Sequence, residues 1–385
     1  MVGSRTNSGL RVLVVGGGIG GLTAALVLAR EGHAVKVLER SARFAPAGAG
    51  IVTAVNASTI LTGLGVDLAG HGHVLDRMEV QRRDGGLLSA MELGAMRARL
   101  GPSFTLSRPA LHEALVAAVP AGVELALGRS VEALAADEAG VRARTDDGSE
   151  GRFDLVIGAD GIHSRVRGLT VGEVPLRYSG VTCWRTICAN PGVDRAIEMW
   201  GGRERVGLVP LRDGQLYVFL VRACERRAAP LSWEGIRAAF GGFGGHVPAV
   251  LGAMEGAALL HHDLEELEAP VWGTGRVLLL GDAAHAMTPN QGQGAAMAIE
   301  DAVALGLALR GGVSGADARY VAMRHGRVRK VQVDSRRIGV VAHWSNPLAV
   351  WIRDALVRRT PQSAAERHFE GLVGPGIELS RAIAG

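Results

Sequence analysis

The stretch that decides the fold is RVLVVGGGIGGLTAALVLAREG, residues 11–32. Its first five residues are rich in β-branched side chains, and the apolar residues after the glycine run recur at helical spacing. The order therefore predicts a strand, a glycine turn and a helix. Within the turn, Gly16, Gly18 and Gly21 fill the pattern G-x-G-x-x-G, which permits a tight turn, a close approach of the backbone to a pyrophosphate, and tight helix-on-strand packing.

A second predicted strand, residues 34–38, ends in a carboxylate that suits a dinucleotide. Glu39 follows Gly18 by 21 residues, where its side chain can accept hydrogen bonds from an adenosine ribose. We assign the neighbouring Arg40 to the same cofactor-binding end. Together these residues predict a Rossmann unit, but this motif alone does not decide between NAD and FAD.

Two further motifs lie downstream. FDLVIGADGIHSRVR, residues 153–167, reads as a strand, a turn at Asp160-Gly161 and the start of a helix. GRVLLLGDAAHAMTPNQGQGAAMAIEDAVALGLAL, residues 275–309, runs a buried strand into Gly281-Asp282, then a loop with Pro289, then a helix that starts near Gly294.

The second of these motifs can hold a flavin. Asp282, at the carboxyl end of its strand, can accept hydrogen bonds from ribityl hydroxyls. The backbone N–H groups of Gly292, Gln293 and Gly294, at the positive end of the following helix, can hold the negative charge of a reduced flavin. We expect His285 to be a loop histidine with its hydrogen bonds satisfied.

The three motifs, in this order and spacing, resemble the single-component (class A) FAD-dependent monooxygenases with the p-hydroxybenzoate hydroxylase fold, over residues 11 to about 310. The resemblance implies an α/β chain with a Rossmann-type FAD-binding domain, an antiparallel β-sheet substrate domain and C-terminal helices. It also implies residue roles. Arg108, in LSRPALHEAL, would contact the flavin nucleotide. Gly50 belongs to the stretch Gly48 to Ile51, which resembles the loop that lies beside the isoalloxazine ring. Asp160, Gly161 and Arg167 would serve FAD phosphate and nicotinamide, and Pro289 would wall the flavin.

The resemblance further implies a reaction. NAD(P)H would reduce a non-covalent FAD, O2 would form a flavin C4a-hydroperoxide, and one oxygen atom would pass to a small aromatic or heteroaromatic substrate. Protein side chains do not activate O2 unaided, and the chain has no haem or iron signature. A flavin must therefore carry the chemistry, and no metal is expected. No second dinucleotide fingerprint follows a strand, so NAD(P)H would dock transiently.

Residues 176–268 alternate in short strands, as in antiparallel hairpins. Arg205 and Tyr217 are the candidate polar groups of the substrate pocket, because this region is similar to that of the flavin-dependent urate hydroxylases. A two-residue turn at Asp213-Gly214 would put them on opposite faces of the sheet, and a three-residue loop would put them on one face. That branch carries an acid after its Thr-Pro, whereas this chain has Asn290, which argues against urate. No acid–base catalyst is identified.

The expected boundaries follow from these segments. The FAD-binding domain would comprise residues 1–71, 96–175 and 269–311, the substrate domain residues 72–95 and 176–268, and a helical region residues 312–385. Trp344 and Trp351, seven residues apart, suggest a core or subunit contact.

Composition excludes several classes of protein. The chain has 385 residues and a net charge of +4, and its densest basic run is RHGRVRKVQVDSRR, residues 324–337. Val328, Val331 and Ile338 interrupt that run at helical spacing, which predicts a solvated surface helix with one buried face rather than a nucleic-acid site. No apolar stretch is long enough to span a membrane and no secretory signal is visible, so we expect a soluble cytoplasmic protein. The oligomeric state is not predicted.

Rival functions remain open at this level. Halogenases of this fold resemble one another in a W-x-W-x-I-P segment, whereas CWRTI, residues 183–187, has one tryptophan. An epoxidase or C=C reductase of the same fold, or a non-catalytic flavin-binding protein, would share the three motifs. A product that gains one oxygen excludes the reductase, and substrate-stimulated NAD(P)H consumption excludes the non-catalytic protein.

Overall fold

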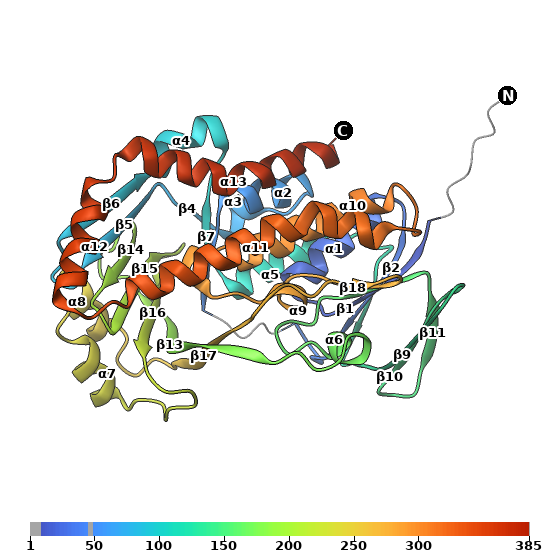
Figure 1. Ribbon diagram of the computed structural model, residues 1–385, viewed down its shortest axis with the longest axis horizontal. Helices are drawn as coiled ribbons and strands as arrows, with labels where there is room; N and C mark the ends of the chain where they lie inside the picture. Colours follow the sequence, from blue (N-terminus) through green and yellow to red (C-terminus); the bar gives the residue numbers. More distant parts are fainter. Residues whose placement is uncertain (1–8, 45–48, 385) are drawn as a thin grey trace.

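The computed structural model describes residues 9–44 and 49–384. The predicted first strand is β1, and it lies inside a six-stranded sheet (Figure 1). The order of this sheet is β18 (Gly273–Thr274), β19 (Val277–Leu279), β12 (Leu155–Gly158), β1 (Arg11–Val15), β2 (Ala34–Glu39) and β8 (Glu124–Leu127). Strand β1 pairs in parallel with β2 and β12, and its last four residues are buried, as in a sheet covered on both faces.

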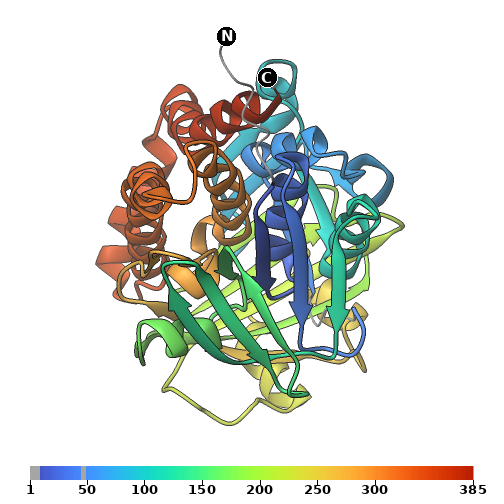
Figure 2. The same cartoon turned by 90° about the vertical axis from the view of Figure 1, so that its right-hand side faces the viewer.

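Helices and a small sheet enclose these strands. Helices α1 (Ile19–Arg30) and α10 (Gly294–Leu309) pack on each other and share one core with the sheet. Figure 2 shows the parallel strands side by side, with the sheet of β9 (Val131–Asp137), β10 (Gly140–Thr145) and β11 (Glu150–Phe153) beside them. The remaining short elements are β3 (Gly50–Thr53), α2 (Val55–Gly63), α3 (Leu68–His71), β4 (His73–Val74), α4 (Leu93–Leu100), β7 (Phe104–Ser107), α5 (Arg108–Ala118), α6 (Arg165–Thr170), α9 (Asp282–His285) and the 3-10 turn η1 (Pro289–Gln291).

A seven-stranded sheet forms the other half of the molecule. Its order is β17 (Leu260–Leu267), β13 (Leu176–Ala189), β16 (Gln215–Ala223), β15 (Glu204–Pro210), β14 (Ala196–Trp200), β5 (Arg77–Arg82) and β6 (Leu87–Glu92). Neighbouring strands are antiparallel except β14 and β5, which are parallel. Alternate residues, among them Trp184, Val206 and Leu220, pack against α7 (Trp233–Phe240) and α8 (Val247–Ala253). The opposite face of the sheet therefore faces the half of the molecule that contains the six-stranded sheet.

The loop between β15 and β16 decides the orientation of two candidate residues. Val209 pairs with Tyr217, and the backbone N–H of Leu211 donates to the carbonyl of Gln215. The loop therefore has three residues, 212–214, of which Asp213 and Gly214 take positive φ angles. With this register, Arg205 and Tyr217 lie on the same face of the sheet, as the three-residue alternative requires.

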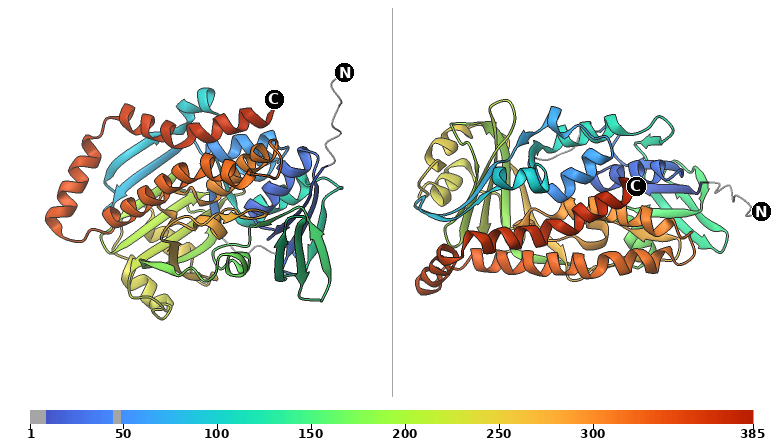
Figure 3. Two further views of the ribbon diagram at one scale, coloured as in Figure 1. Left: turned by 45° about the vertical axis from the view of Figure 1, so that its right-hand side comes forward. Right: turned by 90° about the horizontal axis from the view of Figure 1, so that it is seen from above.

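Three helices follow the core domain. Helices α11 (Ala316–Ala342) and α13 (Gln362–Ala384) run along the length of the molecule, and α12 (Pro347–Arg359) lies at the end that carries the seven-stranded sheet (Figure 3). None of the helices in the described part of the chain has the length and apolarity needed to cross a membrane.

The basic run corrects one expectation. Val328 and Val331 are buried as predicted, but Arg324 is also buried, at 1% exposure. Its Nε donates to Asp301 Oδ1 at 2.6 Å and its Nη1 to Glu300 Oε2 at 2.7 Å. This arginine is therefore no solvated surface residue: two buried carboxylates of α10 compensate its charge.

This ion cluster yields a stability prediction. Arg324→Met leaves Glu300 and Asp301 short of a buried counter-charge, so we expect a loss of about 3–5 kcal/mol in the free energy of unfolding, measured by urea denaturation. Lys330→Met is the control on the same helix, because Lys330 is exposed and pairs only with Asp334, and its effect should stay within about 0.5 kcal/mol. Equal stability of the two variants would contradict the role of Arg324 as the buried counter-charge of Glu300 and Asp301.

Candidate active site

The glycine turn after β1 serves two purposes. A Cβ at Gly21 would lie 1.9 Å from the carbonyl oxygen of Gly16, and one at Gly16 would lie 2.4 Å from that of Ala159. These two glycines are therefore required by backbone packing. At Gly18, by contrast, a Cβ would meet nothing within 4 Å. Gly18 opens onto the cleft at the N-terminus of α1, which is the open cradle that a pyrophosphate needs.

Glu39 stands at the end of β2 beside this turn. Its Oε2 accepts from the Gly17 amide and its Oε1 from the Ser41 amide, both at 2.8 Å. Burial opposes ionisation, but the hydrogen bonds from the Ser41 and Gly17 backbones outweigh it, so the pKa of Glu39 lies below its usual value. Glu39 is therefore an ionised acceptor. Arg40 follows it at the exposed surface.

One cleft of about 570 Å³ lies between the two sheets. Ten of the residues predicted for the site line it: Gly18, Gly50, Arg108, Gly161, Arg205, Tyr217, Asp282, Pro289, Gly292 and Gly294. The others, which do not line it, are Gly16, Gly21, Glu39, Arg40, Asp160, Arg167 and Gln293. Gly48 lies outside the described residues.

Asp160 and Arg167 do not face the cleft, which corrects the direct contacts expected of them. The Asp160 carboxylate accepts hydrogen bonds from the backbone amides of Arg165 and Val166, at 2.7 and 3.0 Å, and thereby caps α6. Arg167 is buried and donates to the carbonyls of Ile162 and Ala283, each at 2.7 Å. Asp160 therefore stabilises the start of α6, and Arg167 joins the loop around Gly161 to α9.

The turn after β19 rests on a buried carboxylate. Asp301 Oδ2 accepts from the Gly281 amide at 3.0 Å and pairs with His285 Nε2 at 2.5 Å. Burial opposes its ionisation, but His285 and Arg324 outweigh burial, so the pKa of Asp301 is lowered. His285 was expected to be fully satisfied, yet its buried Nδ1 lacks a hydrogen-bond partner among the described residues.

The predicted anion site at α10 is smaller than expected. The Gly292 amide already donates to the Pro289 carbonyl at 3.0 Å, because η1 closes there. The Gln293 side chain points away from the cleft and accepts from Asn56 at 3.0 Å. Amides in the first turn of α10, from Gly294 onward, have no intrahelical acceptor and remain for a ligand.

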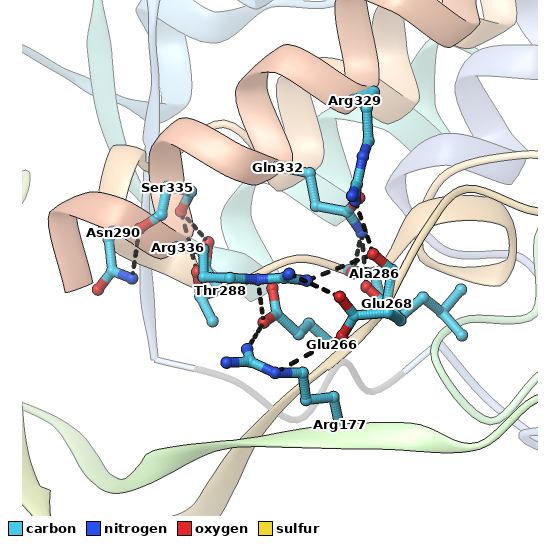
Figure 4. A network of polar contacts seen from close by, with 11 residues as sticks. Arg177, Glu266, Glu268, Ala286, Thr288, Asn290, Arg329, Gln332, Ser335 and Arg336 are labelled. Carbon is cyan, nitrogen blue, oxygen red and sulfur yellow. Dashed lines mark hydrogen bonds and ion pairs between the residues drawn. The ribbon is translucent and has the colours of Figure 1, made fainter. Parts of the chain in front are cut away.

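Helix α11 holds the Pro289 loop in place (Figure 4). Asn290 Nδ2 donates to the Ser335 carbonyl at 2.9 Å, and Ser335 Oγ donates to the Thr288 carbonyl at 2.6 Å. Gln332 Nε2 donates to the Ala286 carbonyl at 3.2 Å. The loop wall of the cleft is therefore fastened to one face of a long helix.

The cleft face of the seven-stranded sheet forms rows of side chains across the strands. One row passes from Arg205 on β15 through Val221 and Cys183 to His262 on β17. The next row comprises Glu198, Gly207, Phe219 and Arg185. The Phe219 ring lies over Gly207, where a Cβ would approach it to 1.8 Å. The floor is thus an aromatic ring with charged groups on both sides.

Arg205 is buried and tied into the wall. Its Nη1 donates to Glu198 Oε1 at 3.0 Å and its Nη2 to Asn290 Oδ1 at 2.7 Å, while its buried Nε lacks a partner in the described residues. Tyr217 packs its ring on Gly50. Burial, partly offset by Arg185, raises the pKa of Tyr217 to about 12, so its hydroxyl stays protonated near neutral pH.

The sequence analysis missed three residues that line the cleft. Arg185 lies on β13 beside Cys183 and Tyr217, and no carboxylate of the described chain pairs with it. His262 has a lowered pKa, caused by burial and by the nearby Arg185, and is therefore neutral at physiological pH. His112 Nε2 lies 2.7 Å from the Gly17 carbonyl. Only the alternation within CWRTI could have placed Arg185 on the face of Cys183.

Comparisons with known proteins agree with this geometry. A family model described as FAD binding domain matches residues 9–331. Aurachin C monooxygenase/isomerase of Stigmatella aurantiaca is 37% identical over 363 residues, covering 91% of this chain and 94% of the relative. The 2-heptyl-3-hydroxy-4(1H)-quinolone synthase of Pseudomonas aeruginosa is 34% identical over 380 residues, covering 94% and 97%. HpxO of Klebsiella pneumoniae, solved with FAD and uric acid, superposes with a TM-score of 0.85 at 27% identity, covering 96% and 97%.

The two kinds of glycine predict different phenotypes. Gly18→Val should keep the thermal stability of the apoprotein but fill the cradle, so the purified protein should be largely colourless by flavin absorbance. Gly21→Val should lose stability as well as flavin, because its side chain would enter the Gly16 backbone. Full flavin content in Gly18→Val would refute the prediction that the open space at Gly18 binds the pyrophosphate.

Proposed function

Since the chain belongs to the class A FAD-dependent monooxygenases with the p-hydroxybenzoate hydroxylase fold, we propose that it hydroxylates a planar, oxo-substituted heteroaromatic ring of the 4-quinolone type. The observation that carries the proposal is the floor of the cleft, where Phe219 lies between Arg185 on one side and the Glu198–Arg205 pair on the other. Two extensively covered relatives carry quinolone or aurachin names, which agrees with such a ring.

The cofactor residues fit FAD. The amides around Gly18 would hold the pyrophosphate, Glu39 the adenosine ribose and Asp282 the ribityl chain, and the first turn of α10, which lines the cleft, would lie at the flavin ring. Bound FAD supplies the redox chemistry, taking a hydride from NAD(P)H and activating O2 for the transfer of one oxygen atom. The protein orients the substrate, excludes water and sets the charge around the ring.

Charges on the floor explain the orientation of such a substrate. Glu198 and Arg185 stand in the same row three strands apart, roughly 14 Å between backbones at the usual strand spacing. Arg205 is already neutralised by Glu198, so Arg185 is the cation of the sheet that would bind a ring oxygen, while Arg108, which also lines the cleft, is assigned to the flavin. Glu198 Oε1 accepts from Trp200 and Arg205, and its second oxygen is available to a ring N–H.

Two further groups keep the pocket neutral elsewhere. The protonated Tyr217 hydroxyl can donate a hydrogen bond, and the neutral His262 imidazole can accept one. The positive charge of Arg185 favours the anionic form of a substrate oxygen bound beside it. The negative charge increases the electron density of the substrate ring, so that the ring can attack an electrophilic oxygen atom.

Substrate assays test the class. We expect a 2-alkyl-4(1H)-quinolone to stimulate NAD(P)H oxidation, and the product to carry one oxygen atom from labelled O2 by mass spectrometry. A polyene oxidised in its place would indicate an epoxidase, and a product without added oxygen a reductase. Hydroxylation of simple benzoates alone would refute the heteroaromatic proposal.

Arg185→Gln tests the orientation. Loss of one charged hydrogen bond should lower kcat/KM about 10- to 100-fold with unchanged flavin content. Arg185→Lys keeps the charge and should recover part of the loss. Arg237→Gln on α7, where Arg237 pairs with Glu255 at the surface, is the control and should behave as the parent protein. An Arg185→Gln enzyme with normal kcat/KM would exclude this residue from substrate binding.

A further inference from the structure

Helix α12 has its apolar face turned to solvent. Leu348, Trp351, Ile352 and Leu356 recur at the spacing of one helix face and are 66%, 64%, 42% and 64% exposed. Surface helices of globular proteins ordinarily bury that face. In this helix the buried residues are the charged pair, Arg353 and Asp354.

The buried charges fix this orientation. Arg353 Nε donates to Asp354 Oδ1 at 2.9 Å and its Nη1 to the Ala342 carbonyl at 3.2 Å. The guanidinium also stacks on the Trp200 ring, 5.1 Å from its centroid. Turning the apolar face inward would break these contacts of Arg353, so they favour the outward orientation of the apolar face.

Two further exposed apolar residues precede α12 in the chain, Val340 in the last turn of α11 and Trp344 in the connection between the two helices. Val340 and Trp344 are 59% and 37% exposed, and α12 lies at one end of the molecule (Figures 1 and 3). We call Val340, Trp344, Leu348, Trp351, Ile352 and Leu356 the outer strip. Large apolar side chains that gather in the exposed part of a helix and of the connection before it mark an interaction surface.

Charge indicates which partner covers the outer strip. Arg358 and Arg359, at the end of α12, are exposed and form no ion pair with the described residues, while the exposed Arg337 on α11 lies 3.6 Å from Asp334. The acidic residues of these segments are already paired, since Asp354 pairs with the buried Arg353 and Asp334 with Lys330 and Arg337. Two copies of the chain meeting through this strip would bring like charges together.

We propose that the outer strip docks the protein on an anionic lipid bilayer, with α12 lying in the interfacial plane. Leucine and isoleucine side chains would enter the acyl boundary, and the two tryptophans would sit at headgroup level. The three arginines would contact anionic headgroups. This docking does not depend on the identity of the substrate.

Vesicle flotation of the flavin-loaded protein tests the proposal. We expect binding to phosphatidylcholine vesicles that contain 30% phosphatidylglycerol, much weaker binding to phosphatidylcholine alone, and loss of binding as NaCl rises. A variant with both Trp351→Ser and Leu356→Ser should bind at least tenfold more weakly, and one with both Arg358→Gln and Arg359→Gln should lose the preference for anionic lipid. Val171→Ser, at an exposed apolar residue of the FAD-binding half, is the matched control.

Flavin content and thermal stability of each variant show that the fold is kept, and sedimentation measures the state of assembly. Binding that the Trp351→Ser, Leu356→Ser variant retains in full, or absence of binding to both vesicle types, overturns the proposal. A parent dimer that this variant dissociates would also overturn it, because the outer strip would then be a contact between two copies.

Discussion

Two adjacent buried carboxylates, Glu300 and Asp301, hold the site together. Asp301 accepts from the Gly281 amide and pairs with His285 and Arg324, while Glu300 accepts from Asn56 and binds Arg324 and Arg327. Their charges are tolerated in the core because α11 supplies an arginine that is buried with them. The turn after β19, helix α2 and helix α11 are thereby joined at the N-terminal half of α10, and this junction positions the turn that leads to Asp282.

The same long helix connects the cofactor side to the substrate side. Ser335 holds Asn290 through its carbonyl, and Asn290 in turn accepts from Arg205 on the substrate sheet. A single amide side chain therefore sets the distance between the Pro289 loop and the floor of the cleft. Because it bonds to both, a shift of α11 would move the flavin wall and the substrate floor together.

Sequence patterns identified residues better than they identified what those residues touch. The glycines of the first motif could be assigned because their spacing is local, and the structure separates Gly18, which opens on the cleft, from Gly16 and Gly21, which serve backbone packing. The Asp160 and Arg167 side chains were expected at the ligand but bond to protein. Whether such a side chain contacts the ligand or the protein depends on residues distant in the chain, which a short motif does not include. Arg185 was missed because no short motif marks it, and only the pairing of distant strands brings it to the cleft.

The sequence by itself determined the order of strands and helices around the three motifs, because that order rests on periodicity and spacing within a few tens of residues. The family and the cofactor followed from the resemblance that the three motifs carry together. Only the tertiary structure decided that Arg205 and Tyr217 share a face, that Arg324 is buried, and that α12 presents its apolar side outward. The physical reason is that a hairpin register, a buried counter-charge and the packing of a helix are each set by contacts between segments far apart in sequence.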